Sequence, residues 1–341
     1  LVQVSTGCLA DSLTSYEADP NVLYVHPDYL FELSAVPNDP FFESLWGLQN
    51  TGDNINDDPE EEPIDPGTPG ADIRAVPAWD LWTGDPEFQI AVLDTGTDFS
   101  HVDLGPNMWV NANEEIWDAN QDWCPGICGV DDDGDGQIDE EAPHCNPILG
   151  SVADDDENGW CDDIYGFDFF HRLPEDPHPF DRVGHGTRVA GIIGAVGDNG
   201  VGVTGVAWRC KIVSLMIVDP GDNKPRVSAI IEAVDSIIEH EIRLSNSGWG
   251  GVAQAFDPGQ PEALYDALVA ARDQVGHLFV FAAGNEALDI DVHAFYPASF
   301  DLDNIISVAA IDNDDLLWSD SDYGEVSVDL GAPGVTIKST D

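Results

Sequence analysis

Three polar residues of this chain stand where a reaction could be carried out: Asp94, His185 and Asn285. Each lies at the end of an apolar segment and has a glycine within two positions. An aspartate can fix the tautomer of a histidine, and the histidine can then take a proton from a nucleophile. An asparagine amide can donate to a developing oxyanion, a contribution of about 2.7–4 kcal/mol where such a donor has been removed. These residue types predict an acyl-transfer site that still needs a nucleophile.

Each of these residues also has a simpler interpretation. A histidine beside glycines is often a turn residue, and an aspartate after a strand often only caps a turn. The elements that would hold the residues therefore decide whether they can act together.

Two apolar strands and one helix are predicted to position the three residues. Residues 88–93 are mostly strand formers and stop at Asp94, and residues 278–283 stop just before Asn285. After His185 the chain is small and almost wholly apolar, which predicts a buried helix with the histidine at its N-terminal end. In open α/β sheets, catalytic groups gather at the carboxyl ends of the strands.

The rest of the chain follows the same alternation of strands and helices. Further strands are expected at residues 211–218, 244–247 and 305–310, with helices at 227–241 and about 261–275. This rhythm predicts an α/β fold with a mainly parallel sheet. A short helix is also expected over residues 72–82, with three apolar side chains available to pack: Trp79, Leu81 and Trp82.

The charge of the chain limits its partners. Its 341 residues include 66 Asp and Glu but only 11 Lys and Arg, a formal net charge of −55. Such an excess argues against nucleic acids and anionic membranes as partners, because their phosphates would be repelled. It favours cation binding, solubility at high salt, or both. No run of about 18 or more apolar residues occurs, so no transmembrane helix is expected.

The six cysteines suggest an oxidising compartment. Four of them lie in one loop-rich region, which predicts one or two disulfides whose pairing is open. Zinc is the less favoured alternative, because the gaps do not match paired zinc-ligand spacings. The four are Cys124, Cys128, Cys145 and Cys161. Cys8 and Cys210 belong to different units and are not expected to pair.

Five segments of the chain resemble motifs of the subtilisin-like serine proteases, the subtilases. The segments around Asp94 and His185 resemble the aspartate and histidine motifs of that family, in the family order of Asp, His and Ser. Residues 282–285 resemble the oxyanion-hole segment, 247–251 the loop that lines the substrate groove, and 331–334 the segment ahead of the catalytic serine.

The resemblance covers about residues 37–341 and implies a three-layer subtilisin-like fold with a mainly parallel central sheet. It implies that Asp94 orients His185 as general base and that Asn285 donates to the oxyanion. The full protein is then a serine endopeptidase that cleaves proteins or peptides through an acyl-serine intermediate. The implied substrate-binding residues are Ser247, Gly248, Trp249, Gly250 and Gly284.

Two departures from the family pattern stand out. Arg188 occupies a position where the family often has a second histidine, which is not the base. The Gly-Thr-Ser motif that carries the nucleophile does not occur, and Ser339 is no substitute, because it matches a residue ahead of the nucleophile. We therefore expect a fragment that ends before the nucleophile and does not complete the reaction alone.

Residues 1–36 resemble the last part of an inhibitory pro-segment, a small α+β unit that would act as an intramolecular inhibitor. Self-cleavage is then expected near residues 32–37. An N-terminal strand–helix ornament is the alternative interpretation. Because the chain opens on Leu1, we expect a secretion signal upstream and an extracellular location, secreted or at the cell surface.

A long acidic insertion at about residues 111–180 contains two loops in which Asp or Asn alternates with other residues before a glycine. Calcium takes about six to eight oxygen ligands, which such loops can wrap around one ion. Neither loop has the glutamate of an EF-hand at its twelfth position. An acidic solvated loop is the alternative for each. The expected calcium ligands are Asp131, Asp133, Asp135, Gln137 and Asp139 in the first loop, and Asp154, Asp156, Asn158, Trp160 and Asp162 in the second.

A third calcium site follows from resemblance to the tight calcium site of the family. It would take side-chain oxygens from Asp39, Asp103 and Asn199 and backbone oxygens from Gly197, Val201 and Val203. Asp39 could instead be a turn cap before Pro40.

These features also fit a second class of protein, a calcium-dependent binding or adhesion module on an inactive protease scaffold. A full-length protein that binds calcium but never reacts with an active-serine probe would indicate the second class.

Overall fold

The computed structural model of the chain describes residues 14–16, 18–22, 35–53, 67–111, 163–170, 178–218, 224–252 and 261–340. The chain divides into two compact units, Leu1–Ala35 and Val36–Asp341. The sheet, the long helices and the predicted catalytic residues belong to the second unit. The two acidic loops at residues 131–139 and 154–162, the four clustered cysteines and most of the predicted pro-segment lie outside the described residues.

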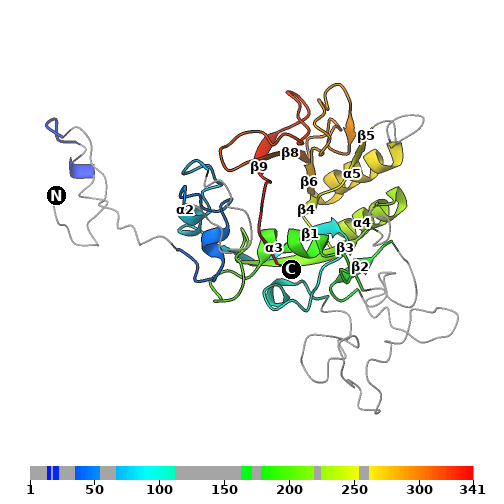
Figure 1. Ribbon diagram of the computed structural model, residues 1–341, viewed down its shortest axis with the longest axis horizontal. Helices are drawn as coiled ribbons and strands as arrows, with labels where there is room; N and C mark the ends of the chain where they lie inside the picture. The colour runs from blue at the N-terminus through cyan, green and yellow to red at the C-terminus, as the bar shows by residue number, and fades with distance from the viewer. Residues whose placement is uncertain are drawn as a thin grey trace, which may run out of the picture. The chain divides into compact units, whose positions relative to one another are not determined.

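A parallel sheet of seven strands forms the centre of the second unit, in the order β2-β3-β1-β4-β6-β8-β9 (Figure 1). Every neighbouring pair in it is parallel, which confirms the predicted mainly parallel sheet. The strands are β1 (Gly84–Asp94), β2 (Gly166–Asp168), β3 (Arg209–Met216), β4 (Leu244–Ser247), β6 (Leu278–Ala282), β8 (Ile305–Ile311) and β9 (Leu330–Pro333). A separate antiparallel pair joins β5 (Gly251–Val252) to β7 (Phe295–Tyr296).

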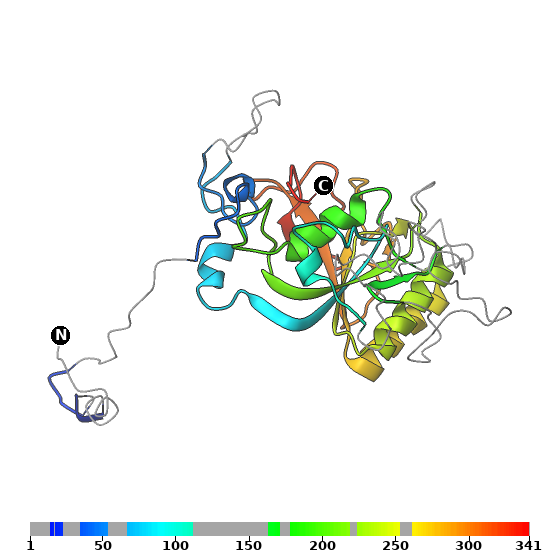
Figure 2. The same cartoon turned by 90° about the horizontal axis from the view of Figure 1, so that it is seen from below.

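Helices cover both faces of the sheet and give three layers (Figure 2). Helices α4 (Val227–Glu239) and α5 (Glu262–Val275) pack against one face, where they share a core with Ala91 and Leu93 of β1. Helix α3 (His185–Gly194) packs against the other face, where it shares a core with Ile90 and Val92. Successive residues of a strand point to opposite faces, so a strand covered on both sides needs a continuous apolar run.

The core under α4 and α5 is aromatic as well as aliphatic. Phe279 and Phe281 of β6 are fully buried, and their rings stack with centroids 5.7 Å apart. Full burial of such a side chain contributes about 1.5–3 kcal/mol. The strand that leads to Asn285 is therefore firmly anchored.

Helix α3 differs from its prediction, because only one side of it is buried. Ala190 faces the core and Gly191 is buried against Ser339 and Thr340, but Arg188 and Ile192 lie at the surface. The apolar composition on all sides predicted a completely buried helix. That prediction holds for one side of α3 and is wrong for the other.

The expected helix at residues 72–82 is shorter than predicted. Helix α2 spans only Ala75–Trp79, and Trp79 is buried against Trp208, with ring centroids 5.0 Å apart. Leu81 and Trp82 are 89% and 66% exposed, so the prediction that they pack was wrong. Both residues lie in the turn between α2 and β1. The helix has already ended there, so its buried face does not extend to them. The second unit also contains two short 3-10 helices, η2 (Phe42–Ser44) and η3 (Gly105–Asn107).

Within the described ranges, no helix has the length and apolar composition needed to cross a membrane.

Cys210 is buried and free, and its burial raises the pKa of the thiol to about 11. A thiol with that pKa stays protonated and unreactive at neutral pH.

His277 is a buried structural histidine just ahead of β6. Its Nδ1–H donates to the backbone oxygen of Ile242 at 2.7 Å, and its Nε2 accepts from Oγ of Ser245 at 2.8 Å. Burial lowers the pKa of His277 to about 4, although the bond to Ile242 acts in the opposite direction. The ring is therefore neutral at physiological pH.

We predict that His277 makes the folded state less stable as the pH falls from 6.5 to 4. Above pH 6.5 the ring is neutral in both the folded and the unfolded state. Between pH 6.5 and about pH 4, the unfolded chain binds a proton at this histidine and the folded chain does not. The loss amounts to roughly 3 kcal/mol at most. Urea unfolding of the wild type and of His277→Gln, at several pH values, measures the difference. The same pH dependence in both proteins would show that His277 does not contribute.

Candidate active site

Asp94 and His185 meet at the carboxyl edge of the sheet, although 91 residues separate them in the sequence. Asp94 ends β1, and its side chain is only 4% exposed. His185 is the first residue of α3, and 49% of its side chain is exposed. Oδ1 of Asp94 lies 2.6 Å from Nδ1 of His185, as predicted for an orienting carboxylate and a base.

This contact fixes which nitrogen of His185 can act as a base. A carboxylate can only accept, so Nδ1 carries the proton, and Nε2 of the neutral ring keeps its lone pair. The hydrogen bond from Nδ1 to Asp94 raises the pKa of His185 above its ordinary 6.5, against the lowering effect of partial burial. The charge of Asp94 raises that pKa further, that of Arg188 lowers it, and that of Asp181 raises it. The pair is therefore suited to hold a proton that arrives at Nε2.

The close approach of α3 to β1 requires glycine at position 186. A Cβ on Gly186 would lie 2.0 Å from the backbone oxygen of Gly96 and 3.1 Å from Cβ of Asp94. Any side chain would push the first turn of α3 away from the strand. The backbone N–H of Gly186 donates to Oγ1 of Thr95 at 2.9 Å, which ties the helix to the residue after Asp94.

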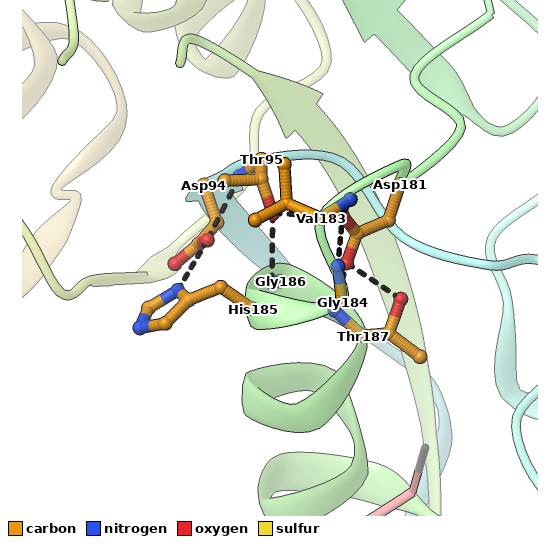
Figure 3. Close-up of polar contacts among 8 residues, drawn as sticks. All are labelled: Asp94, Thr95, Asp181, Val183, Gly184, His185, Gly186 and Thr187. Carbon is orange, nitrogen blue, oxygen red and sulfur yellow. Dashed lines mark hydrogen bonds and ion pairs between the residues drawn. The ribbon is translucent and has the colours of Figure 1, made fainter. Parts of the chain in front are cut away.

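Asp181 is a buried residue of the site that sequence reasoning missed (Figure 3). Its carboxylate accepts five hydrogen bonds, from the N–H groups of Val183, Gly184 and Thr187 and from the hydroxyls of Thr95 and Thr187. The sequence signal was weak, because Asp181 stands three positions ahead of the N-cap Gly184, and capping residues are common only at the N-cap itself.

The segment predicted to carry the oxyanion donor follows β6. Asn285 is exposed, and Gly284 before it has a φ of +121°, a conformation that favours glycine. Oδ1 of the fully buried Asp322 accepts from the N–H groups of Glu286 and Leu288, at 2.9 and 2.8 Å. The N–H of Asp322 donates to the oxygen of Gly284 at 2.9 Å. Asp322, a second residue that sequence reasoning missed, thus holds the backbone on both sides of Asn285.

A cavity of about 510 Å³ lies at the carboxyl ends of β4 and β6, and neither Asp94 nor His185 is among the residues that line it. Of the predicted substrate-binding residues, Ser247, Gly248 and Gly284 line it together with Asn285, and apolar residues of β8 and β9 form much of the rest. A methyl group at Gly248 would lie 3.8 Å from Cε1 of His185, so the cavity adjoins the ring.

The other two predicted substrate-binding residues are not among the residues that line this cavity. The ring of Trp249 packs edge-on against Phe281, with centroids 5.5 Å apart. Gly250 lies against the ring of Phe295, where a Cβ would be 2.1 Å from Cε1.

Ser339 is engaged away from the base. Its hydroxyl donates to the backbone oxygen of Arg188 at 2.6 Å, on the side of α3. Among the described residues, no hydroxyl hydrogen-bonds to Nε2 of His185. This geometry agrees with the expectation that Ser339 does not replace the nucleophile.

The residues of the third predicted calcium site lie together. Asp39 and Asp103 are both buried, and Asn199 contacts each of them: Nδ2 donates to Asp103 at 2.7 Å and its N–H to Asp39 at 3.3 Å. The N–H groups of Asp198 and Val203 also donate to these carboxylates, at 2.7 and 2.9 Å. Burial, and to a lesser degree the charge of Asp39, raises the pKa of Asp103.

This donor set fits a hard cation, because all its candidate ligands are oxygens. In the described part of the chain, no three His, Cys, Asp or Glu side chains are arranged so that they could hold a metal ion by themselves. An ion bound to Asp39 and Asp103 would therefore need further oxygens, such as those of Asn199 and of the backbone at Gly197, Val201 and Val203.

Comparison with known proteins finds a family that this chain resembles over most of its length. The profile of the subtilase family matches residues 85–341. A thermophilic serine proteinase of Bacillus sp. (strain AK1) is 29% identical over 326 residues, which cover 94% of this chain and 57% of that protein. Subtilisin-like protease 2 of Plasmodium falciparum (isolate 3D7) is 28% identical over 269 residues, 79% of this chain and 16% of that protein. The chain thus spans well under two thirds of the length of these relatives.

Solved structures agree on the fold. The crystal structure of a cold-adapted subtilisin-like serine proteinase has a TM-score of 0.50 at 23% identity, over 86% of this chain and 74% of that chain. A protease of Pseudoalteromonas arctica has a TM-score of 0.51 at 23% identity, over 88% of this chain and 73% of that chain. At this identity the likeness establishes the three-layer fold alone.

We predict that Asp94→Asn lowers the pKa of His185, because it removes the charged acceptor that stabilises the imidazolium. An NMR titration of the Cε1 proton of His185 measures this directly in the chain. The wild-type midpoint should lie above 6.5, and the variant midpoint below that of the wild type. Asp98→Asn is the control, because that carboxylate binds only Ser100 in its own turn. Equal midpoints for the wild type and Asp94→Asn would contradict the assignment.

Proposed function

The chain belongs to the subtilase family, and from the hydrogen bond between Asp94 and His185 we propose that its parent protein is a serine endopeptidase. Family membership supports a serine-type peptidase, and this hydrogen bond supports the particular roles of Asp94 and His185. The nucleophile is a serine of the whole protein that must reach Nε2 of His185.

In the proposed reaction, Nε2 of His185 takes the proton of the serine hydroxyl while the serine oxygen attacks the peptide carbonyl carbon. Asp94 stabilises the imidazolium that forms, and it keeps Nδ1 protonated throughout. The carbonyl oxygen becomes an oxyanion, to which the side-chain amide of Asn285 donates. The imidazolium then gives its proton to the leaving amine, and an acyl-enzyme remains for hydrolysis by water.

The proposed substrate is an extended segment of a protein or peptide. The cavity next to His185 is open to backbone contacts from the ends of β4 and β6, and Gly248 leaves room there for a second chain. Pairing with backbone groups favours an extended substrate of varied sequence.

We also propose that residues 1–36 inhibit the protease as a pro-segment and that the protein acts outside the cell. A separate compact unit at Leu1–Ala35 supports the first proposal. The grouping of four cysteines in one region supports the second.

Calcium is the proposed stabilising ion. Asp39, Asp103 and Asn199 would hold it together with backbone oxygens, and the two acidic loops of the insertion would hold further ions. Two buried carboxylates in contact with one asparagine support this proposal. A bound ion adds stability because it binds only the folded chain.

His185→Ala in the whole protein should lower kcat/KM for a peptide substrate by about three orders of magnitude or more, because the reaction loses its base. His293→Ala is the control, since that histidine is exposed and outside the site. Steady-state cleavage of a fluorogenic peptide measures both variants. An unchanged rate for His185→Ala would refute the role of the base. A calcium-binding wild type that cleaves nothing would indicate the binding module instead.

Removal of calcium with a chelator should lower the melting temperature of the chain. An ion at about 100 times its Kd stabilises the folded state by about 2.7 kcal/mol. Asp103→Asn should shrink the shift, because it removes one buried ligand. Asp291→Asn, an exposed aspartate that binds the backbone at residues 326 and 327, should keep the shift. Equal melting temperatures with calcium and with chelator would exclude calcium as a stabilising ion.

A further inference from the structure

The helix that carries His185 begins without a capping side chain of its own. Its N-cap is Gly184, in a left-handed conformation with a φ of +88°. The first N–H groups of a helix have no partner within the helix, and a Ser, Thr, Asp or Asn at the N-cap normally provides one. The acceptors for α3 must therefore come from elsewhere.

Asp181 accepts from two of these groups, the N–H of Gly184 and that of Thr187. Its Oδ1 accepts from the N–H groups of Val183 and Gly184 at 2.9 and 2.8 Å. Its Oδ2 accepts from the N–H and the hydroxyl of Thr187 at 2.8 and 2.7 Å. The bound groups lie on both sides of His185 along the chain, so one buried carboxylate determines the path of the backbone at the histidine.

The same carboxylate reaches the strand that carries Asp94. Oγ1 of Thr95 donates to Oδ1 of Asp181 at 2.9 Å and accepts from the N–H of Gly186 at 2.9 Å. The N–H of Thr95 donates to Oδ1 of Asp94 at 2.8 Å. Figure 3 shows these contacts between the end of β1 and the first turn of α3.

The histidine ring needs this support because half of it is exposed. At 49% exposure, packing alone leaves its position loosely defined, yet its Nδ1 must stay 2.6 Å from Oδ1 of Asp94. Asp94 and His185 belong to different elements, so their distance depends on how α3 is fixed to β1. Asp181 and Thr95 are the polar residues that bridge the two elements at this point.

We propose that Asp181 is a positioning residue that sets the hydrogen bond between His185 and Asp94 by fixing the first turn of α3 to the end of β1 through Thr95. It touches none of the reacting atoms. Only the catalytic consequence rests on the proposed peptidase function; the geometric role does not.

The charge of Asp181 acts in the same direction as its geometry. Together with Asp94 it favours the protonated ring, whereas Arg188 on the same helix opposes it. Neutralising Asp181 should therefore weaken the imidazolium both by loosening the contact to Asp94 and by removing a nearby negative charge.

The first test is NMR on the chain itself. In the wild type, the Nδ1 proton of His185 should resonate at low field, as a proton shared with a buried carboxylate does, and Asp94→Asn should abolish that signal and so identify it. Asp181→Asn keeps the size of the side chain but turns an NH₂ group toward the N–H of Thr187. We expect this variant to shift or broaden the signal and to lower the pKa of His185, while Asp98→Asn changes neither.

A second variant keeps the test decisive where Asp181→Asn does not fold. Thr95→Val removes only the hydroxyl that joins β1 to Asp181 and keeps the shape of the side chain. In a folded Thr95→Val chain, a shifted or broadened signal supports the proposal. A signal and a titration midpoint equal to those of the wild type, in either folded variant, would overturn it.

The catalytic consequence is measured in the whole protein. Asp181→Asn should lower kcat by about 10- to 100-fold and leave KM nearly unchanged, since a small misplacement of a base affects the chemical step more than binding. A wild type without peptidase activity would defeat the proposed function but not the NMR result. An unchanged kcat in an active enzyme would overturn the proposal.

Discussion

The candidate active site depends on one hydrogen bond, between a carboxylate that ends a strand and a histidine that begins a helix. Asp94 is held by β1, which is buried on both faces at its carboxyl end. His185 is held by the first turn of α3, which approaches the strand only because Gly186 has no side chain. The distance of 2.6 Å is thus the product of sheet, helix packing and capping together. A change in any of these would alter this contact and, with it, the basicity of Nε2.

The parallel sheet gathers the remaining groups at the same edge. Strands β1, β4 and β6 are neighbours in the sheet and all end there, which brings Gly248 and Asn285 to the cavity beside the histidine. Asp322 fixes the backbone around Asn285 in much the same way as Asp181 fixes that around His185. His185 and Asn285, both exposed, therefore each stand on a backbone held by a buried carboxylate. Such support is what a preorganised site requires.

The sequence predicted the elements that depend on local pattern. Apolar runs gave β1, β6 and β8 to within a few residues, and the polar residues that end them gave Asp94 and Asn285. The supporting residues Asp181 and Asp322 were not predicted. Each binds backbone N–H groups that come close to its carboxylate only when the chain has folded. Leu81 and Trp82 were misjudged for the converse reason: their apolar character was evident, but the early end of α2 was not. The sequence likewise could not show that only one side of α3 is covered by other elements, because all its sides are largely apolar.

In the proposed reaction, His185, oriented by Asp94, activates a serine by taking the proton of its hydroxyl. The most direct measurement is the reaction of the whole protein with a fluorophosphonate probe, followed by mass spectrometry of the modified peptides. We predict one modified serine in the wild type, and loss of that modification in a folded His185→Ala variant. A wild type that folds and leaves the probe unreacted, or equal labelling in His185→Ala, would contradict the claim.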